Sequence, residues 1–223
     1  MGNKLMVAFP LYHLMSTQFF VRWLAMEKQP LLNTIVVDGA YLITSMEIIV
    51  DRALKMPDWD RLVVFEHDMI PPVHAFNRIA QYTPEHAVVG SMYFCHDEPH
   101  NANVFVEQPK DEYSLITPQT VADWCASPGL YQCGGVGFGF TSIARHVLES
   151  WDPDIPMFAM DKRVGSHDLW FCDQAQKQGH KVFVDSGVVC DHLTTVPIGL
   201  SHNQACAHMI DDAEVLDFSY AGS

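Results

Sequence analysis

Arg61-Leu62-Val63-Val64-Phe65 is a short apolar run that is followed at once by Glu66-His67-Asp68 and, two residues later, by Pro71-Pro72. A β-branched and aromatic run ahead of prolines predicts a buried strand. Glu66 and Asp68 then lie at the carboxyl edge of a sheet, where ligands bind in open α/β folds. Carboxylates at this spacing can turn toward one cation, and their oxygens suit Mg²⁺ or Mn²⁺ bound with phosphates. The junction therefore indicates a site for a metal and a diphosphate, with a plain acidic turn as the alternative.

Strand and helix patterns alternate on both sides of this junction. The predicted strands are 4–9, 34–37, 61–65 and 87–93, and the predicted helices are 17–27, 44–55 and 71–82. Thr44 and Glu47 form a capping box for the second helix, and Pro71-Pro72 is expected to start the third. Alternation of this kind predicts a Rossmann-like α/β fold, in which helices flank a mostly parallel sheet.

The second half of the chain is less regular. From His96 to Pro128 the periodicity fades, which predicts long loops and an edge strand over 103–107. After the glycines at 134 to 139, Thr141 or Ser142 is expected to cap a helix that ends near Ser150. The last predicted elements are a helix over 168–178 and two short strands, 181–184 and 188–190, around a turn at 185–187.

The 223 residues, 48% hydrophobic and 18% charged, suit one globular α/β domain. We expect it to span 1–193, with a small antiparallel edge portion, and a tail over 194–223 to be packed on it or loosely attached. The uncharged stretch from Leu5 to Val21 includes Pro10 and His13, so it predicts neither a signal sequence nor a membrane span. Six cysteines without a CxxC spacing favour reduced thiols. We therefore expect a soluble protein in the cytoplasm.

The formal net charge is −14, from 27 acidic against 13 basic residues, and no run of Lys or Arg interrupts it. Such a surface repels polyanions, so strong binding to nucleic acid is not expected. The charge still leaves room for an enzyme that modifies a DNA base. A protein that binds divalent cations tolerates this acidity well.

Four features occur in a definite order along the chain: Glu66-His67-Asp68, the glycines at 134 to 139, Ser166-His167-Asp168 at the start of a helix, and Cys190-Asp191-His192. This order resembles the GT-A glycosyltransferases, whose shared marks are a DxD motif, a glycine loop, an xED motif and a C-terminal histidine. The resemblance runs from about Lys4 to His192, and it is most specific from Gly165 onward. It implies a single GT-A type domain.

The resemblance implies a metal site. Asp68 matches the metal-ligating acid of the DxD motif, Glu66 its partner toward the metal or the donor ribose, and His192 the third protein contact. Imidazole and carboxylate are good ligands for Mn²⁺, with Mg²⁺ as the alternative, and diphosphate oxygens complete the shell. Taken alone, His192 also fits an ordinary turn histidine after a strand.

The resemblance also assigns a base. Asp168 matches the acid that takes the proton of the acceptor hydroxyl in inverting members of the family. A carboxylate at a helix N-terminus fits a structural capping role equally well. His167 stands where the family has Glu, which leaves open whether the imidazole assists the acceptor or fills space.

Donor contacts are expected from several regions. The residues so assigned are Pro10, Tyr12, Asp38, Glu66, His67, Gly134 and Gly135. The glycines let the backbone approach the donor sugar, although a crowded sheet crossing also needs glycine. Ser45-Met46 stands where related sequences carry Arg-Asn, so donor binding is expected to differ. His96 and His100 could form a second metal site, but Pro99 favours a solvated loop.

The expected function is metal-dependent transfer of a sugar from a nucleoside diphosphate sugar, UDP-linked before GDP-linked, to an acceptor hydroxyl on a protein, a glycan or a modified nucleobase. Asp168 as the base favours inversion. Small family-2-like transferases of viruses and bacteria are similar in size, so a phage-encoded protein would act in the host cytoplasm. The alternatives are an inactive module that binds nucleotide sugars and a nucleotidyltransferase. The latter normally needs a basic, glycine-rich phosphate loop, which Pro10-Leu11-Tyr12-His13 does not offer.

Overall fold

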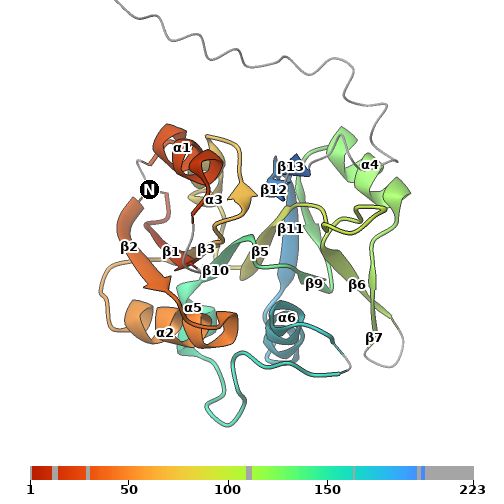
Figure 1. Cartoon of the computed structure of the whole chain (residues 1–223). Coiled ribbons are helices and arrows are strands. Elements are labelled where there is room, and N and C mark those ends of the chain that lie inside the picture. Colours follow the sequence, from red (N-terminus) through yellow and green to blue (C-terminus); the bar gives the residue numbers. More distant parts are fainter. Residues whose placement is uncertain are drawn as a thin grey trace, which may run out of the picture.

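The computed structural model of the protein describes residues 2–11, 15–28, 31–108, 112–162, 164–194 and 197–198. The predicted strand β3 (Arg61–Phe65) is the third of seven in the central sheet, whose order is β2-β1-β3-β10-β5-β11-β8 (Figure 1). The other strands are β1 (Leu5–Leu11), β2 (Leu31–Asp38), β5 (Val88–Met92), β8 (Leu130–Gln132), β10 (Phe140–Ala144) and β11 (Val182–Val189). β10 and β8 run antiparallel to their neighbours, whereas the remaining pairs are parallel. The mostly parallel sheet of the prediction is confirmed.

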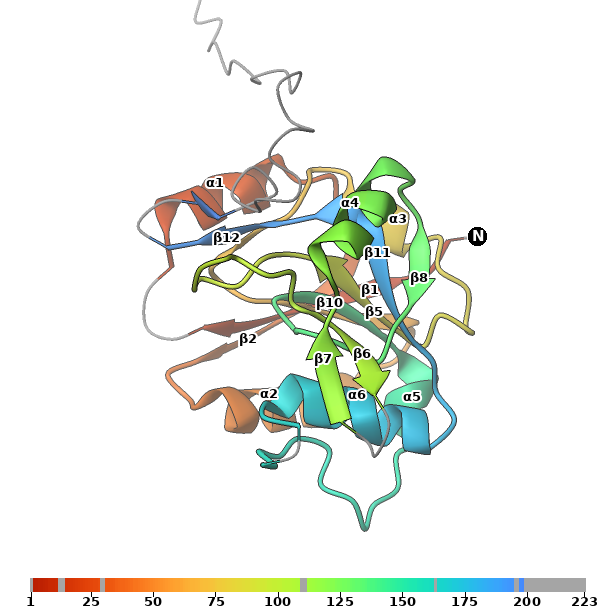
Figure 2. The same ribbon diagram turned by 90° about the vertical axis from the view of Figure 1, so that its right-hand side faces the viewer.

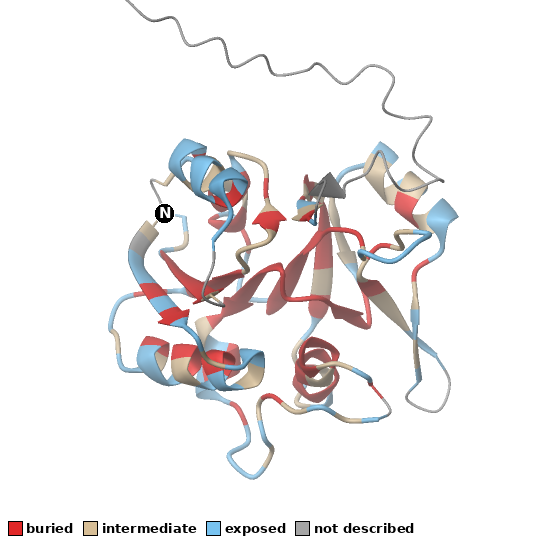
Figure 3. Cartoon of the chain, viewed as in Figure 1, coloured by how far each residue is buried: buried red, intermediate tan, exposed pale blue. Residues whose placement is uncertain are grey.

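Helices cover both faces of this sheet (Figure 1). They are α1 (Thr17–Ala25), α2 (Leu42–Leu54), α3 (Ala75–Ile79), α4 (Pro118–Ala126), α5 (Arg145–Glu149) and α6 (His167–Lys177). The strands alternate as an internal sheet requires, because Leu62 and Val64 of β3 join the core beneath α2, α5 and α6, while Val63 and Phe65 join the core beneath α1 and α3. Figure 3 shows the buried strands at the centre and exposed outer faces on the helices.

Two small antiparallel sheets complete the fold. One has the order β13-β12-β4 and is formed by β4 (Met69–Ile70), β12 (Asp191–Leu193) and β13 (Pro197–Ile198). The other has the order β7-β6-β9 and is formed by β6 (Val104–Gln108), β7 (Glu112–Leu115) and β9 (Gly135–Val136). Figure 2 faces β6 and β7. The predicted edge strand is therefore present, but in a separate sheet.

Two predicted helices differ in the structure. α2 begins at Leu42, its N-cap is Tyr41, and no side chain caps it, so the predicted capping box at Thr44 is wrong. The helix predicted from Pro71 to Tyr82 is only α3, since Met69 and Ile70 pair with β12 and the chain must turn before a helix can start.

The helix predicted to begin at Thr141 or Ser142 is wrong over its first half. These residues lie in β10, which is buried along its length between β3 and β5, and α5 follows only at Arg145. Neither hydroxyl caps a helix, because Thr141 Oγ1 donates to the carbonyl of Gly137, four residues earlier, and Ser142 Oγ accepts from Arg61 Nε on the neighbouring strand.

The two short strands predicted around a turn at 185–187 form one strand, β11, with an irregular register between Asp185 and Val189. Asp185 is buried there because its carboxylate accepts hydrogen bonds from the Arg78 guanidinium and the Tyr82 hydroxyl. Among the described residues, no helix is long and apolar enough to cross a membrane. Most of the predicted tail, 199–223, lies outside the described residues.

Candidate metal and nucleotide site

The loop Glu66-His67-Asp68 lies directly after β3, where the sequence predicts it, and backbone hydrogen bonds fix it on two sides. Glu66 N donates to the Gly139 carbonyl at 2.8 Å, which ties the loop to the segment before β10. Leu193 N donates to the Asp68 carbonyl at 2.6 Å, which ties it to β12. The loop therefore connects the central sheet with the small sheet that carries His192.

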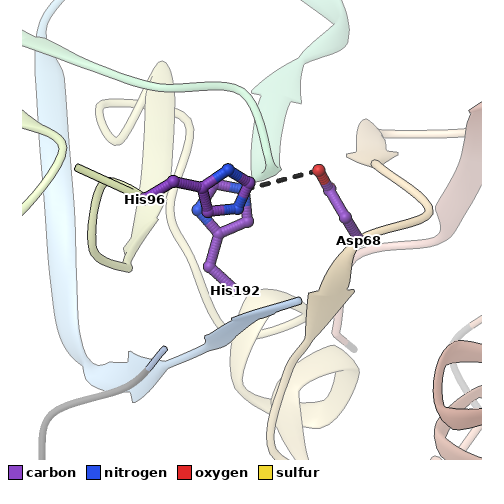
Figure 4. Close-up of side chains that lie close together, drawn as sticks. All are labelled: Asp68, His96 and His192. Atoms are coloured by element: carbon purple, nitrogen blue, oxygen red, sulfur yellow. Dashed lines mark ion pairs between the residues drawn. The ribbon is translucent and has the colours of Figure 1, made fainter. Parts of the chain in front are cut away.

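Three side chains from distant parts of the sequence meet beside this loop. Asp68, His96 and His192 each offer one ligand atom, and these atoms all lie within 4.8 Å of one another (Figure 4). His192 Nε2 lies 3.4 Å from Asp68 Oδ2, and the His96 ring stacks on the His192 ring at 3.7 Å between centroids. The structure thus brings together two residues predicted as ligands, Asp68 and His192, and adds His96.

The orientation of His192 is fixed by its second nitrogen. Nδ1 lies 2.8 Å from the carbonyl oxygen of Phe94, and a carbonyl can only accept, so Nδ1 carries the hydrogen. Nε2 faces Asp68: it donates toward the carboxylate when the ring is protonated, and it offers a lone pair to a cation when the ring is neutral. A histidine whose outer nitrogen donates to a carbonyl is a common arrangement in metal sites.

The donor set fits a divalent cation. Asp68 Oδ1 is buried and has no hydrogen-bond partner among the described residues, so this carboxylate keeps an unused acceptor beside the oxygen that faces His192. Burial acts to raise the pKa of Asp68, but the hydrogen bond and charge of His192, and then the charge of His67, hold that pKa below its ordinary value. Burial and the charge of His192 lower the pKa of His96, which keeps its imidazole available as a ligand. Two imidazoles and one carboxylate suit Mn²⁺ and related transition metals.

Glu66 has the opposite electrostatics. Burial, and then the charges of Asp68 and Asp168, raise the pKa of Glu66 to about 8. Its carboxyl group lies outside the three-residue group, and at neutral pH it is mainly protonated while no cation is present. A cation held at Asp68 would favour the ionised form of Glu66.

A cavity of about 230 Å³ opens next to the loop. Its walls are Pro10, Leu11, Ala40, Leu42, Ser45, Glu66, His67 and Asp68. It lies at the carboxyl ends of β1 and β3 and at the first turn of α2, whose exposed N–H groups favour anions. Pro10, Glu66 and His67, all predicted as donor contacts, therefore line one cavity.

The other predicted donor residues lie elsewhere. Asp38 is exposed at the end of β2, opposite Leu11, and is not part of the cavity wall. A Cβ on Gly134 would lie 2.6 Å from Glu107 N, and one on Gly135 would lie 2.2 Å from Leu169 Cδ1. Gly134 thus lets β6 pack closely against this segment, and Gly135 does the same for α6. This agrees with the alternative reading, in which the glycines are needed at a crowded crossing of the sheet. Tyr12 lies outside the described residues.

The residues predicted as catalytic begin α6. Ser166 is the N-cap, and Asp168 lies in the first turn, where its Oδ1 accepts from Leu169 N at 2.9 Å. The charge of Asp168 contributes to raising the pKa of both Glu66 and Tyr93, whose hydroxyl stays protonated chiefly because it is buried. His167 Nε2 is buried without a partner, and burial lowers the pKa of this imidazole.

His96 lies in the loop that the sequence predicted to be solvated, and it is exposed there, yet it joins Asp68 and His192 in the three-residue group. Pro99 does prevent a regular helix there, and His100 turns away to bond the Cys95 carbonyl. The partner of His96 is His192, ninety-six residues further along the chain, and no spacing in the sequence reveals that pair. The available signal was position, because His96 follows a predicted buried strand by three residues.

No family model matches the sequence, and no curated protein does either. Solved structures do match. A197 from STIV has a TM-score of 0.62 at 19% identity, over 89% of this chain and 91% of that one. GalNAc-T7, solved with UDP, GalNAc and Mn²⁺, has a TM-score of 0.60 at 10% identity, over 86% of this chain but only 43% of that one. The inositol-1-phosphate CTP transferase from T. maritima has a TM-score of 0.50 at 8% identity, over 96% and 99% of the two chains.

At sequence identities this low, the matches are evidence about the fold of the chain and not about its function. The first two matches cover most of this chain, which consists of the seven-stranded sheet, the helices on both of its faces and the small antiparallel sheets. The protein therefore has a GT-A-like fold.

Proposed function

We propose that the protein is a metal-dependent glycosyltransferase that moves a sugar from a nucleoside diphosphate sugar, UDP-linked in preference to GDP-linked, to an acceptor hydroxyl. The observation that carries the proposal is the meeting of Asp68, His96 and His192 beside the cavity after β3, where Asp68 Oδ1 is buried and has no partner in the described part of the chain. In open α/β sheets, that edge is where ligands bind.

Asp68, His96 and His192 would hold Mn²⁺ or Mg²⁺, with Glu66 as a further partner toward the cation or the donor ribose. A bound cation neutralises the charge that develops on the departing nucleoside diphosphate. The protein's own part is to hold the three ligands in place and to keep their remaining polar atoms satisfied. The likeness to GalNAc-T7, which was solved with UDP and Mn²⁺, supports this reading.

The donor would occupy the cavity lined by Pro10, Glu66 and His67. Asp38, at the end of β2, and Tyr12, which lies outside the described residues, would contact the nucleotide. Gly134 and Gly135 are proposed as backbone contacts to the sugar, on the resemblance alone.

Asp168 is proposed as the base that takes the proton of the acceptor hydroxyl, with inversion as the outcome. The N–H groups at the start of α6 stabilise its ionised form, and the hydroxyl becomes acidic as the C1–O bond breaks. His167, with a buried and unpartnered Nε2, would contribute a hydrogen bond to the acceptor. A protein, a glycan or a modified nucleobase could supply the acceptor, and the cytoplasm is the proposed location.

A nucleotidyltransferase is the second candidate, and the likeness to the CTP transferase from T. maritima favours it. That reaction releases diphosphate from a nucleoside triphosphate, whereas sugar transfer releases a nucleoside diphosphate. An inactive module that binds nucleotide sugars is the third.

The test is a thermal-shift panel of UDP-, GDP-, CDP- and dTDP-sugars and of CTP, each with and without Mn²⁺, because a ligand that binds only the native state raises its stability. A nucleotide sugar together with Mn²⁺ should give a larger shift than either gives alone. If this added shift is lost in Asp68→Ala and kept in the exposed control Asp123→Ala, the result supports the proposal. Asp168→Asn should keep this shift and lose turnover. A shift with CTP alone would support the nucleotidyltransferase, and turnover unchanged by Asp168→Asn would refute the assigned base.

A further inference from the structure

His192 is surrounded by one short segment of the chain, the residues that follow β5. The Phe94 carbonyl accepts from its Nδ1, and the His96 ring stacks on one face of the imidazole. The Tyr93 ring approaches it at 5.4 Å between centroids and at an interplanar angle of 84°, an edge-to-face contact. Tyr93 therefore limits how the His192 ring can tilt.

The hydroxyl of Tyr93 reaches the other ligand-bearing segment. It accepts one hydrogen bond from Gly139 N at 3.4 Å and another from Asn103 Nδ2 at 2.6 Å. The carbonyl of the same Gly139 accepts from Glu66 N at 2.8 Å, and Glu66 begins the loop that ends at Asp68. Tyr93 thus contacts His192 directly with its ring. Its hydroxyl is linked to the Asp68 loop indirectly, because Gly139 bonds both the hydroxyl and Glu66.

The backbone around this hydroxyl is shaped to receive it. A Cβ on Gly137 would lie 1.9 Å from Tyr93 Oη and 2.2 Å from Asn103 Nδ2, so only glycine leaves room for the pair. Tyr93 is itself buried, with 4% of its surface exposed, so its hydroxyl does not meet a substrate directly.

We infer that Tyr93 is a positioning residue for the metal site, which sets the separation of Asp68 and His192 by joining the two segments that carry them. The inference rests on the proposed function, because it assumes that these residues hold a cation. Outer residues that orient metal ligands change metal affinity when they are replaced, even though they never touch the metal.

The alternative is that Tyr93 has only a structural role, as a tyrosine of the hydrophobic core. Both readings predict some loss of stability when the hydroxyl is removed. Only the positioning role predicts a change in cation affinity, and only that role predicts an altered spectrum of the bound cation.

The experiment compares Tyr93→Phe with Tyr113→Phe. The Tyr113 hydroxyl donates to Asp173 at 2.9 Å, between β7 and α6, and this pair contacts none of the three ligands. Mn²⁺ affinity would be measured by calorimetry, and the environment of the ion by electron paramagnetic resonance. We expect Tyr93→Phe to weaken Mn²⁺ binding about tenfold and to change the spectrum, and Tyr113→Phe to change neither.

Unchanged affinity and spectrum in Tyr93→Phe, in a wild type that binds Mn²⁺, would overturn the inference and leave the proposed function standing. A wild type that binds no Mn²⁺ would overturn both. If Tyr93→Phe does not fold, Asn103→Ala removes the shorter of the two hydrogen bonds that hold the hydroxyl, while the ring and the bond from Gly139 N stay. The hydroxyl is then less firmly placed, and Mn²⁺ binding should weaken in the same direction. Wild-type affinity in Asn103→Ala would then overturn the inference.

Discussion

The carboxyl groups of Glu66 and Asp68, which are separated by one residue, have opposite electrostatic environments. His192 lowers the pKa of Asp68 against the effect of its burial, whereas burial and neighbouring acids raise the pKa of Glu66 to about 8. Divergent values of this kind separate the roles of neighbouring acids. In the proposed site, Asp68 would be the ionised ligand, and the charge of Glu66 would depend on whether a cation is bound.

The raised pKa of Glu66 predicts a pH dependence of stability in the presence of a chelator. Glu66 is protonated in the folded protein up to about pH 8, but in the unfolded chain it ionises near its ordinary value of 4.5, so its contribution to stability is complete at low pH and is lost as the pH rises toward 8. Between pH 5 and pH 8, Glu66→Gln should gain stability relative to wild type by up to about 4 kcal/mol.

Chemical denaturation at several pH values measures this difference. Glu112→Gln is the control, because Glu112 is exposed, and its stability should follow that of wild type. A constant difference between wild type and Glu66→Gln over this range would show that Glu66 is ionised in the folded protein.

At the scale of single elements, the strands were the predictable part. The run from Arg61 to Phe65 is apolar throughout and forms β3, because a strand buried on both faces needs no alternation. The helix prediction at Thr141 and Ser142 was wrong because these hydroxyls have other partners: Ser142 accepts from Arg61, distant in the sequence, and Thr141 donates to the carbonyl of Gly137, four residues earlier. A hydroxyl that resembles a cap cannot be distinguished from a buried strand residue without those partners.

The stretch between β9 and β10 shows why glycine recurs there. A Cβ on Gly137 would overlap the Tyr93 hydroxyl, and one on Gly139 would lie 2.8 Å from Met69 Cε. The sequence predicted close approach at the glycines, but toward a donor sugar. In the structure, Gly137 instead leaves room for the side chains of Tyr93 and Asn103, and Gly139 for that of Met69.

Gly137→Ala should therefore destabilise the protein by roughly 1–3 kcal/mol, the usual effect of overpacking a buried site, and should weaken Mn²⁺ binding. The free energy of unfolding in urea measures the first effect, and calorimetry measures the second. Gly129→Ala is the matched control, because a Cβ there has its nearest neighbour at 3.8 Å, an ordinary contact. Equal stability of Gly137→Ala and Gly129→Ala would mean that the backbone at residue 137 can shift to accommodate a Cβ without a cost in stability.

At the scale of the whole molecule, the fold assembles the site from segments that are far apart in sequence. Asp68 follows β3 and His96 follows β5, and these two strands flank β10 in the central sheet. His192 lies in β12, which pairs with β4 in a small sheet. The fold class and two of the three side chains could be predicted, because a strand end and a family resemblance mark them. His96 could not, since stacking on His192 depends on the parallel pairing of β5 with β11.

This assembly predicts that a cation stabilises the entire domain. The unfolded chain does not hold the three ligands together, so Mn²⁺ at about one hundred times its dissociation constant should add about 2.7 kcal/mol and raise Tm by several degrees without any nucleotide. His96→Ala should lose most of this shift, whereas His180→Ala should keep it, because His180 lies beside Ser150 and His146, apart from the metal group. Differential scanning calorimetry with and without Mn²⁺ measures both. A full shift in His96→Ala would remove this histidine from the ligand set and return the site to the Asp68 and His192 pair, with Glu66 as the remaining candidate for the third position.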